Sequence, residues 1–294
     1  MPQNPTATTA LLQELIGLLS LERLEDNMFR GSSRNIGANR VYGGQVLGQA
    51  IQAAQYTVEG RDVHSFHAYF LREGNCDAPI VYVVDRNRDG GSFSSRRVVA
   101  IQHGQPICTL AASFHRRESG LDRQHAAPRV SPPEQLPTVA ELGARHAATL
   151  DATLTRYATK TLGPFELRPA EPDFMAPGNG VPYRNLWFRI PVPVPDDELL
   201  QRAILAYLSD QNMLGTTLDP HRGDIAGQRV QMASLDHAMW FHRPFRIDEW
   251  MLYASESPNL SAGRGLARGS IYRRDGTLVA STMQEGMVRV VSPA

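Results

Sequence analysis

Hydrophobic and polar positions follow two different periods along the chain, and each period occupies separate blocks. Residues 8–20 carry apolar side chains at helical spacing, and Thr8 or Thr9 is a suitable cap for the predicted helix. A short strand is expected from about 21 to 30. Residues 41–58 predict a second helix. It contains small residues, which would allow a curved sheet to approach its backbone closely: Gly43, Gly44, Gly48, Ala50, Ala53 and Ala54.

Between residues 62 and 115 the pattern changes to segments rich in β-branched and aromatic residues, separated by Gly, Asp and Asn turns. These segments predict antiparallel strands at 64–70, 80–84, 92–102 and 106–114. Residues 116–137 contain four prolines among polar residues, which indicates a linker. A short helix is expected at 139–150.

The second half repeats the order of the first, with a helix expected at 195–214 and strands near 228–241, 248–256, 261–273 and 277–290. The string from His67 to Arg72 aligns with the string from His237 to Arg243 if one residue is inserted. A helix followed by an antiparallel sheet, present twice, predicts an α+β fold. Pairing the two sheets edge to edge would remove two exposed edges and leave a groove between the two helices.

The length and the repeat together predict two domains joined by a linker. The 294 residues suit two units of roughly 120–150 residues each. We expect an N-terminal domain over residues 1–115, a linker over 116–165 and a C-terminal domain over 166–294.

Composition excludes several classes of function. Lys plus Arg equals Asp plus Glu at 30 each, and a neutral chain is not expected to bind nucleic acid. Two cysteines are too few for a disulfide framework or a zinc site. No apolar run approaches the ~18 residues that a membrane span needs, and the N-terminus lacks the pattern of a signal peptide. We therefore expect a cytoplasmic protein with no membrane partner.

Asp210 lies at the end of an apolar stripe on the helix predicted around 199–210. The stripe shares one helix face with it: Leu199, Ala203, Ala206 and Tyr207. A carboxylate in such a place is costly unless it is hydrogen-bonded or functional. An exposed Asp at a frayed helix end fits the same pattern equally well.

Ser234 and Gln284 are polar residues in strands that otherwise follow a regular pattern. Alternation places Gln284 on the same face as Leu278, Ala280 and Thr282, and a buried amide requires hydrogen-bond partners. Taken alone, Gln284 is more often a satisfied core amide than a catalyst, and Ser234 is more often an ordinary strand serine.

A catalytic triad of Ser234, His237 and Asp236 is not expected. Adjacent strand residues point to opposite faces, so Asp236 and His237 cannot both serve Ser234, and no nucleophile-elbow motif is present. His237, like His67, is interpreted as structural. Phosphate-loop, dinucleotide-binding and metal-ligand motifs are also absent, so no cofactor and no metal is predicted.

Four strings spread over nearly the whole chain resemble the type II acyl-CoA thioesterases. The strings cover residues 41–50, 63–72, 234–245 and 280–286. The resemblance implies a double hot-dog fold with one continuous sheet, hydrolysis of fatty acyl-CoA to free fatty acid and CoA, and assembly into homo-oligomers. It assigns catalysis to Asp210, Ser234 and Gln284, with Asp210 accepting a proton from an attacking water that Ser234 and Gln284 hold. Gly43 and Gly44 are candidates for substrate binding through backbone N–H groups that stabilise the oxyanion.

Two alternative functions would use the same fold. A hot-dog hydratase would place a proline and a histidine after the helix aspartate, whereas Asp210 is followed by Gln211-Asn212-Met213-Leu214. A non-catalytic acyl-CoA-binding protein would share the fold without the activity. The presence of all three catalytic residue types disfavours that second alternative.

Overall fold

The structure is a computed structural model of the chain, and it describes residues 5–37, 40–146, 163–171, 180–211 and 213–291. The first half contains α1 (Pro5–Leu19), β1 (Glu22–Glu25), β2 (Met28–Gly31), α2 (Gly43–Gln55), β3 (Asp62–Phe70), β4 (Ile80–Asp89), β5 (Phe93–Gln102) and β6 (Gln105–His115). The second half contains η1 (Pro133–Gln135), α3 (Val139–Arg145), β7 (Glu166–Pro169), β8 (Tyr183–Arg189), α5 (Glu198–Ser209), α6 (Gly215–Leu218), η3 (Asp219–His221), β9 (Arg229–Ser234), β10 (Asp236–Phe241), β11 (Met251–Ser261), β12 (Arg264–Arg273) and β13 (Leu278–Val291).

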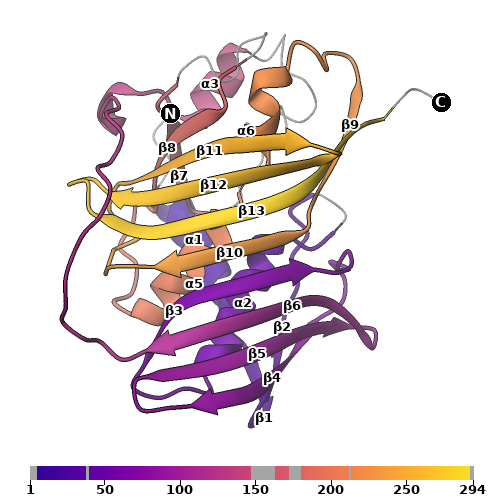
Figure 1. Cartoon of the computed structure of the whole chain (residues 1–294), viewed down its shortest axis with the longest axis vertical. Coiled ribbons are helices and arrows are strands. Elements are labelled where there is room, and N and C mark those ends of the chain that lie inside the picture. The colour runs from indigo at the N-terminus through magenta and orange to yellow at the C-terminus, as the bar shows by residue number, and fades with distance from the viewer. Residues whose placement is uncertain (1–4, 38–39, 147–162, 172–179, 212, 292–294) are drawn as a thin grey trace.

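The strands of the described residues join one sheet in the order β1-β2-β4-β5-β6-β3-β10-β13-β12-β11-β8-β7, with β9 paired to β13 (Figure 1). The two halves meet where β3 pairs antiparallel with β10, in the register Ala68 opposite His237. The predicted α+β fold with two helix-plus-sheet repeats in one continuous sheet is confirmed. The division into domains at residues 115 and 166 stays a prediction.

Matching hydrogen bonds relate the two halves. The N–H of Leu71 donates to Ile107 O, and the N–H of His242 donates to Val279 O, each at 2.8 Å. Leu71 and His242 therefore occupy equivalent positions after β3 and β10. Counting back from these two points, buried positions alternate with more exposed ones in the same way in both strands: Ala68 and Phe66 in β3, Met239 and His237 in β10.

Counting back from this equivalence places Phe66, and not His67, at the position of His237. The alignment of His67 with His237 was therefore wrong by one residue. His237 is buried and lies on the face that meets the helices, whereas His67 is exposed on the opposite face. From Phe66 and His237 to Leu71 and His242 the two halves align without an inserted residue.

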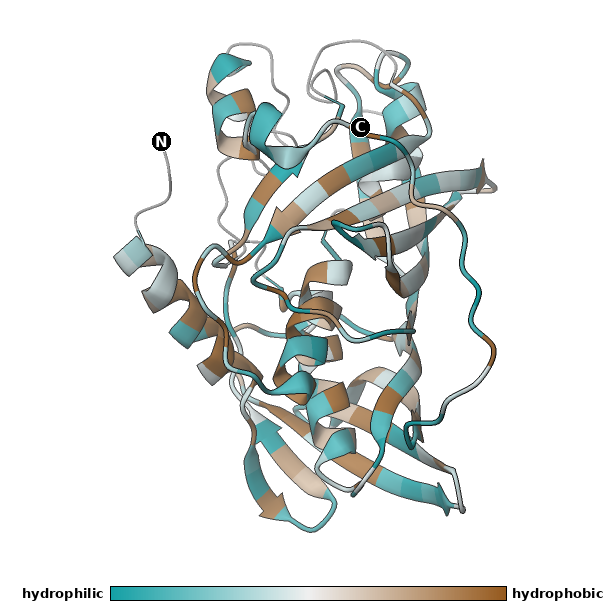
Figure 2. Ribbon diagram, turned by 90° about the vertical axis from the view of Figure 1, so that its left-hand side faces the viewer, coloured by the Kyte–Doolittle hydropathy of each residue, from teal (hydrophilic) through white to brown (hydrophobic). Residues whose placement is uncertain are grey.

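Helices α2 and α5 cover one face of the sheet and enclose the main hydrophobic core, with α1 packed against them on the outside (Figures 1 and 2). A Cβ on Gly44 would lie 2.2 Å from Tyr207 O, and one on Gly48 would lie 3.0 Å from Ala203 O. The small residues of α2 thus allow close contact with the backbone of another helix, where a curved sheet had been expected.

Several predicted boundaries differ from the structure. Helix α1 begins at Pro5, which suits a helix's first turn, so Thr8 is a buried helical residue and neither Thr8 nor Thr9 is the cap. The strand expected at 21–30 is the hairpin β1–β2. Strands β7 and β8 were not predicted; they correspond to β1 and β2 in the order of the sheet. The predicted helix at 139–150 ends at Arg145, and residues 147–150 lie outside the described residues.

Residues 116–132 run without helix or strand, and the part from Gln124 to Ser131 is attached to the second half. The amide of Gln124 donates to Gly276 O at 2.7 Å, and its oxygen accepts from Leu278 N at 2.9 Å. Trp187 Nε1 donates to Ser131 O at 2.9 Å. The described part of the chain contains no helix long and apolar enough to cross a membrane.

We expect Gly48→Val to lower the free energy of unfolding by about 1–3 kcal/mol, because the added atoms would overlap Leu19 and the Ala203 carbonyl. Gly17→Val is the matched control, since a Cβ there would meet nothing within 4 Å in the described chain. Urea unfolding of both variants measures the difference. Equal stabilities would show that the helix contact does not depend on glycine.

Candidate active site

Asp210 is held between the ends of two helices. It is the residue that follows α5, where it forms the C-cap. The N–H of Gly44, in the first turn of α2, donates to Asp210 Oδ2 at 2.9 Å. The hydrogen bond is possible because Gly44 lacks a Cβ, which lets the start of α2 reach the last turn of α5. Asp210 is thus an ordered, hydrogen-bonded residue and not an exposed Asp at a frayed end.

Gln284 connects Asp210 with Ser234. Its Nε2 donates to Asp210 Oδ1 at 2.6 Å and to Ser234 Oγ at 3.1 Å. Ser234 is the last residue of β9, and Gln284 lies on the neighbouring strand β13 with only 1% of its surface exposed. The three residues that the sequence singled out from distant segments therefore meet through one amide group.

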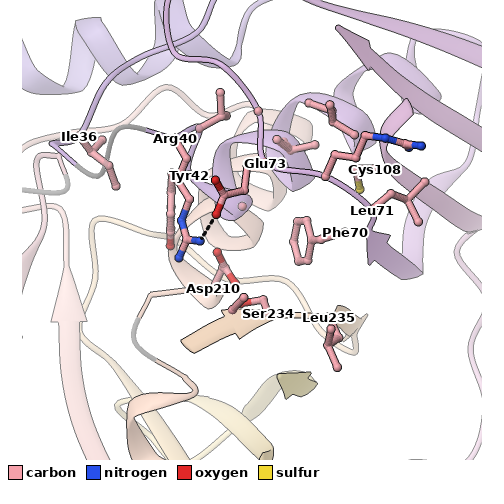
Figure 3. A pocket seen from close by; sticks show the side chains of 17 residues that line it. Ile36, Arg40, Tyr42, Phe70, Leu71, Glu73, Cys108, Asp210, Ser234 and Leu235 are labelled. Carbon is pink, nitrogen blue, oxygen red and sulfur yellow. Dashed lines mark hydrogen bonds and ion pairs between the residues drawn. The ribbon is translucent and has the colours of Figure 1, made fainter. Parts of the chain in front are cut away.

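A cavity of about 430 Å³ opens beside these residues (Figure 3). Asp210 and Ser234 lie on its wall, whereas Gln284 does not line it. Much of the remaining wall is apolar and comes from α2, the end of β3, the start of β6 and the segment before α2: Ile36, Val41, Val46, Phe70, Leu71, Ile107 and Cys108. The cavity thus places a carboxylate and a hydroxyl next to a surface that suits a hydrocarbon chain.

Burial raises the pKa of Asp210 to about 6, against the opposing effects of Gln284, the Gly44 N–H and the positive charge of Arg40. Arg40 itself pairs with Glu73 at 2.9 Å on the cavity wall above Asp210 (Figure 3). A carboxyl group with such a pKa is largely ionised at pH 7 and is still a stronger base than an ordinary aspartate.

The rejected triad does not form. His237 Nε2 lies 2.9 Å from Ser209 Oγ, and the Asp236 carboxylate accepts from Glu285 N at 2.6 Å. Neither residue lines the cavity. The opposite directions of Asp236 and His237 follow from strand alternation, as expected.

The two glycines that were predicted to bind substrate make different contacts. Gly43 lines the cavity, next to Asp210 and Phe70. Gly44 uses its N–H for Asp210. Arg40, Phe70 and Cys108 also line the cavity, and no local sequence pattern brings 40–46, 70–74 and 107–108 together. Among the described residues, no group of three or more His, Cys, Asp or Glu side chains could hold a metal ion.

Two family models match the chain. The model described as "Acyl-CoA thioesterase N-terminal domain" matches residues 30–115, and the model described as "Acyl-CoA thioesterase" matches residues 159–287. The chain is 40% identical to Acyl-CoA thioesterase 2 of Haemophilus influenzae, over 95% of this chain and 98% of that protein. It is 39% identical to Acyl-coenzyme A thioesterase 8 of Homo sapiens, over 93% of this chain and 88% of that protein.

A solved structure shows the same likeness. The crystal structure of the acyl-CoA thioesterase II TesB2 from Mycobacterium marinum has a TM-score of 0.78 and 40% identity, over 95% of this chain and 99% of that one. A protein of unknown function from Alicyclobacillus acidocaldarius, described as having a hot-dog fold, superimposes with a TM-score of 0.74 at 19% identity, which supports the double hot-dog fold. On the strength of the two family models and these full-length relatives, the chain belongs to the type II acyl-CoA thioesterases and is a thioester hydrolase.

Proposed function

We propose that this enzyme hydrolyses fatty acyl-CoA to a free fatty acid and CoA by direct attack of a water molecule that Asp210, Ser234 and Gln284 activate. The observation that carries the proposal is the Gln284 amide, which joins the Asp210 carboxylate to the Ser234 hydroxyl on the wall of a largely apolar cavity. A thioester carbonyl is electrophilic enough for water to attack it without a covalent enzyme intermediate.

The hydrogen bonds of Gln284 indicate which group would donate to the attacking water and which would accept from it. Gln284 Nε2 carries two hydrogens and gives one to Asp210 and one to Ser234, so Ser234 Oγ accepts from it and keeps its own hydrogen to donate. A water between the two cavity residues would accept from Ser234 and donate to Asp210. Its remaining lone pair would then face the thioester. Gln284 thus acts as a positioning residue, and Asp210 acts as the general base.

The cavity would hold the acyl chain and the thioester in different places. Its apolar wall suits the acyl chain, and the thioester would lie next to Asp210 at the N-terminal end of α2. The Gly44 N–H already binds Asp210, so the Gly43 N–H, the first of the helix, is the better candidate for the oxyanion. Assembly into a homo-oligomer and a cytoplasmic location stay predictions.

Asp210→Asn should reduce thiol release from acyl-CoA by at least about 10²-fold, because the amide cannot accept the proton of water. Ser234→Ala and Gln284→Ala should lower kcat by smaller factors and leave acyl-CoA binding in place. Free-thiol release from acyl-CoA esters of increasing chain length measures all three variants.

Asp236→Asn is a matched control, since this partly buried carboxylate lies near the site but outside the cavity. Wild-type turnover in the Asp210 variant would refute the mechanism, and binding without turnover in the wild type would favour an acyl-CoA-binding protein.

The rate should rise with pH through about 6 and level off above about 7. Asp210 must be ionised to act as a base, and burial raises its pKa to about 6. Arg40→Gln should move this rise to higher pH, because the Arg40 charge lowers the pKa of Asp210. Initial rates of thiol release between pH 4.5 and 8.5 measure both effects. A wild-type profile that rises near pH 4 would show that Asp210 is not the titrating base.

A further inference from the structure

A second group of polar side chains lies behind the site and surrounds Ser209, the residue before Asp210. His237 Nε2 lies 2.9 Å from Ser209 Oγ, and Tyr253 Oη donates to Ser209 O at 3.0 Å. Thr282 Oγ1 lies 2.8 Å from Tyr253 Oη. His237 and Ser209 are both completely buried. Contacts from two strands thus hold the last turn of α5 at its side chain and at its carbonyl.

The hydrogen bonds determine which nitrogen of His237 carries the proton. The Ser209 hydroxyl donates to Ala206 O at 2.9 Å, so it must accept from His237 Nε2–H. Burial lowers the pKa of His237 to about 3, so the ring is neutral. Its Nδ1 is then a buried acceptor that receives no hydrogen bond from any described residue. Packing alone does not explain a ring with this unsatisfied atom.

The position equivalent to His237 in the first half shows which kind of side chain fills this part of the core when no hydrogen bond is needed. It is occupied by Phe66, a fully buried phenylalanine in the same core. Phe66 pairs with Ala112 on β6, and continuing the register of Ala238 with Met283 by one residue places His237 beside Gln284 on β13. A histidine and a glutamine therefore stand, in the half that carries Asp210, where the other half has a phenylalanine and an alanine.

We propose that His237 is a positioning residue for thioester hydrolysis: its Nε2–H holds Ser209 and thereby fixes the Asp210 carboxylate against Gln284 and Ser234. His237 does not line the cavity, so it acts on the reaction only through the end of α5. The proposal rests on the proposed function of Asp210. Its consequence is a loss of turnover without a matching loss of substrate affinity.

The test compares kcat and KM for acyl-CoA hydrolysis in His237 and Ser209 variants. His237→Phe copies the residue of the first half, and we expect kcat to fall on the order of 10-fold to 100-fold with KM within about 2-fold of wild type. His237→Gln places an N–H near the position of Nε2 and should restore most of kcat, whereas His237→Asn places it near Nδ1 and should not. Ser209→Ala should reproduce the loss, and the double variant should show no further loss.

His242→Phe is the matched control, because His242 also pairs with a serine hydroxyl, Ser281 Oγ at 2.9 Å, but is exposed on the outer face. It should keep wild-type kcat. A His237→Phe enzyme with wild-type kcat, or equal kcat in the Gln and Asn variants, would overturn the proposal. If His237→Phe does not fold, wild-type kcat in Ser209→Ala overturns it in the same way. Asp210→Asn is measured alongside: full activity there would reject the proposed function itself, whatever the His237 variants show.

Discussion

The close contact of α2 with α5 is the constraint on which the site depends. Gly44 and Gly48 allow the backbone of α2 to pass next to the carbonyls of Tyr207 and Ala203, and no larger residue fits at Gly44 without moving one helix. This approach brings the first N–H groups of α2 to the residue that ends α5. Without it, the Asp210 carboxylate would have no partner from the first half of the chain, and its burial would be too costly.

The electrostatic situation of Asp210 follows from the same contact. A helix C-terminus disfavours a negative charge and a helix N-terminus favours one, so the carboxylate lies between opposing dipoles. Burial also disfavours the charge and raises the pKa of Asp210. Gln284, the Gly44 N–H and the charge of Arg40 favour the charge and lower that pKa. The balance leaves a pKa of about 6, which suits a base that must be ionised at neutral pH and still accept a proton.

The two halves share a backbone plan but differ in the polar residues of their cores. Tyr82 and Tyr253 occupy equivalent positions and both donate to the interior, Tyr82 to Gln49 and Tyr253 to Ser209. Gln284, by contrast, corresponds to Ala112, which cannot connect a carboxylate to a hydroxyl. The repeat therefore builds one sheet with two covering helices, while the hydrogen bonds of Gln284 to Asp210 and Ser234 form within the second half.

The sequence by itself determined the helix-plus-sheet repeat, because alternation and helical spacing are local properties of the chain. It also indicated Asp210, Ser234 and Gln284 through resemblance to a family, although the residue pattern alone left each of them open to a structural explanation. Only the tertiary structure decided that Gln284 donates to both of the others, that Gly44 binds Asp210, and that Arg40 and Phe70 share the cavity. It also corrected the equivalent of His237 from His67 to Phe66. A shift of one residue turns a strand side chain to the other face, and the hydrogen bonds that make Leu71 equivalent to His242 fix that register.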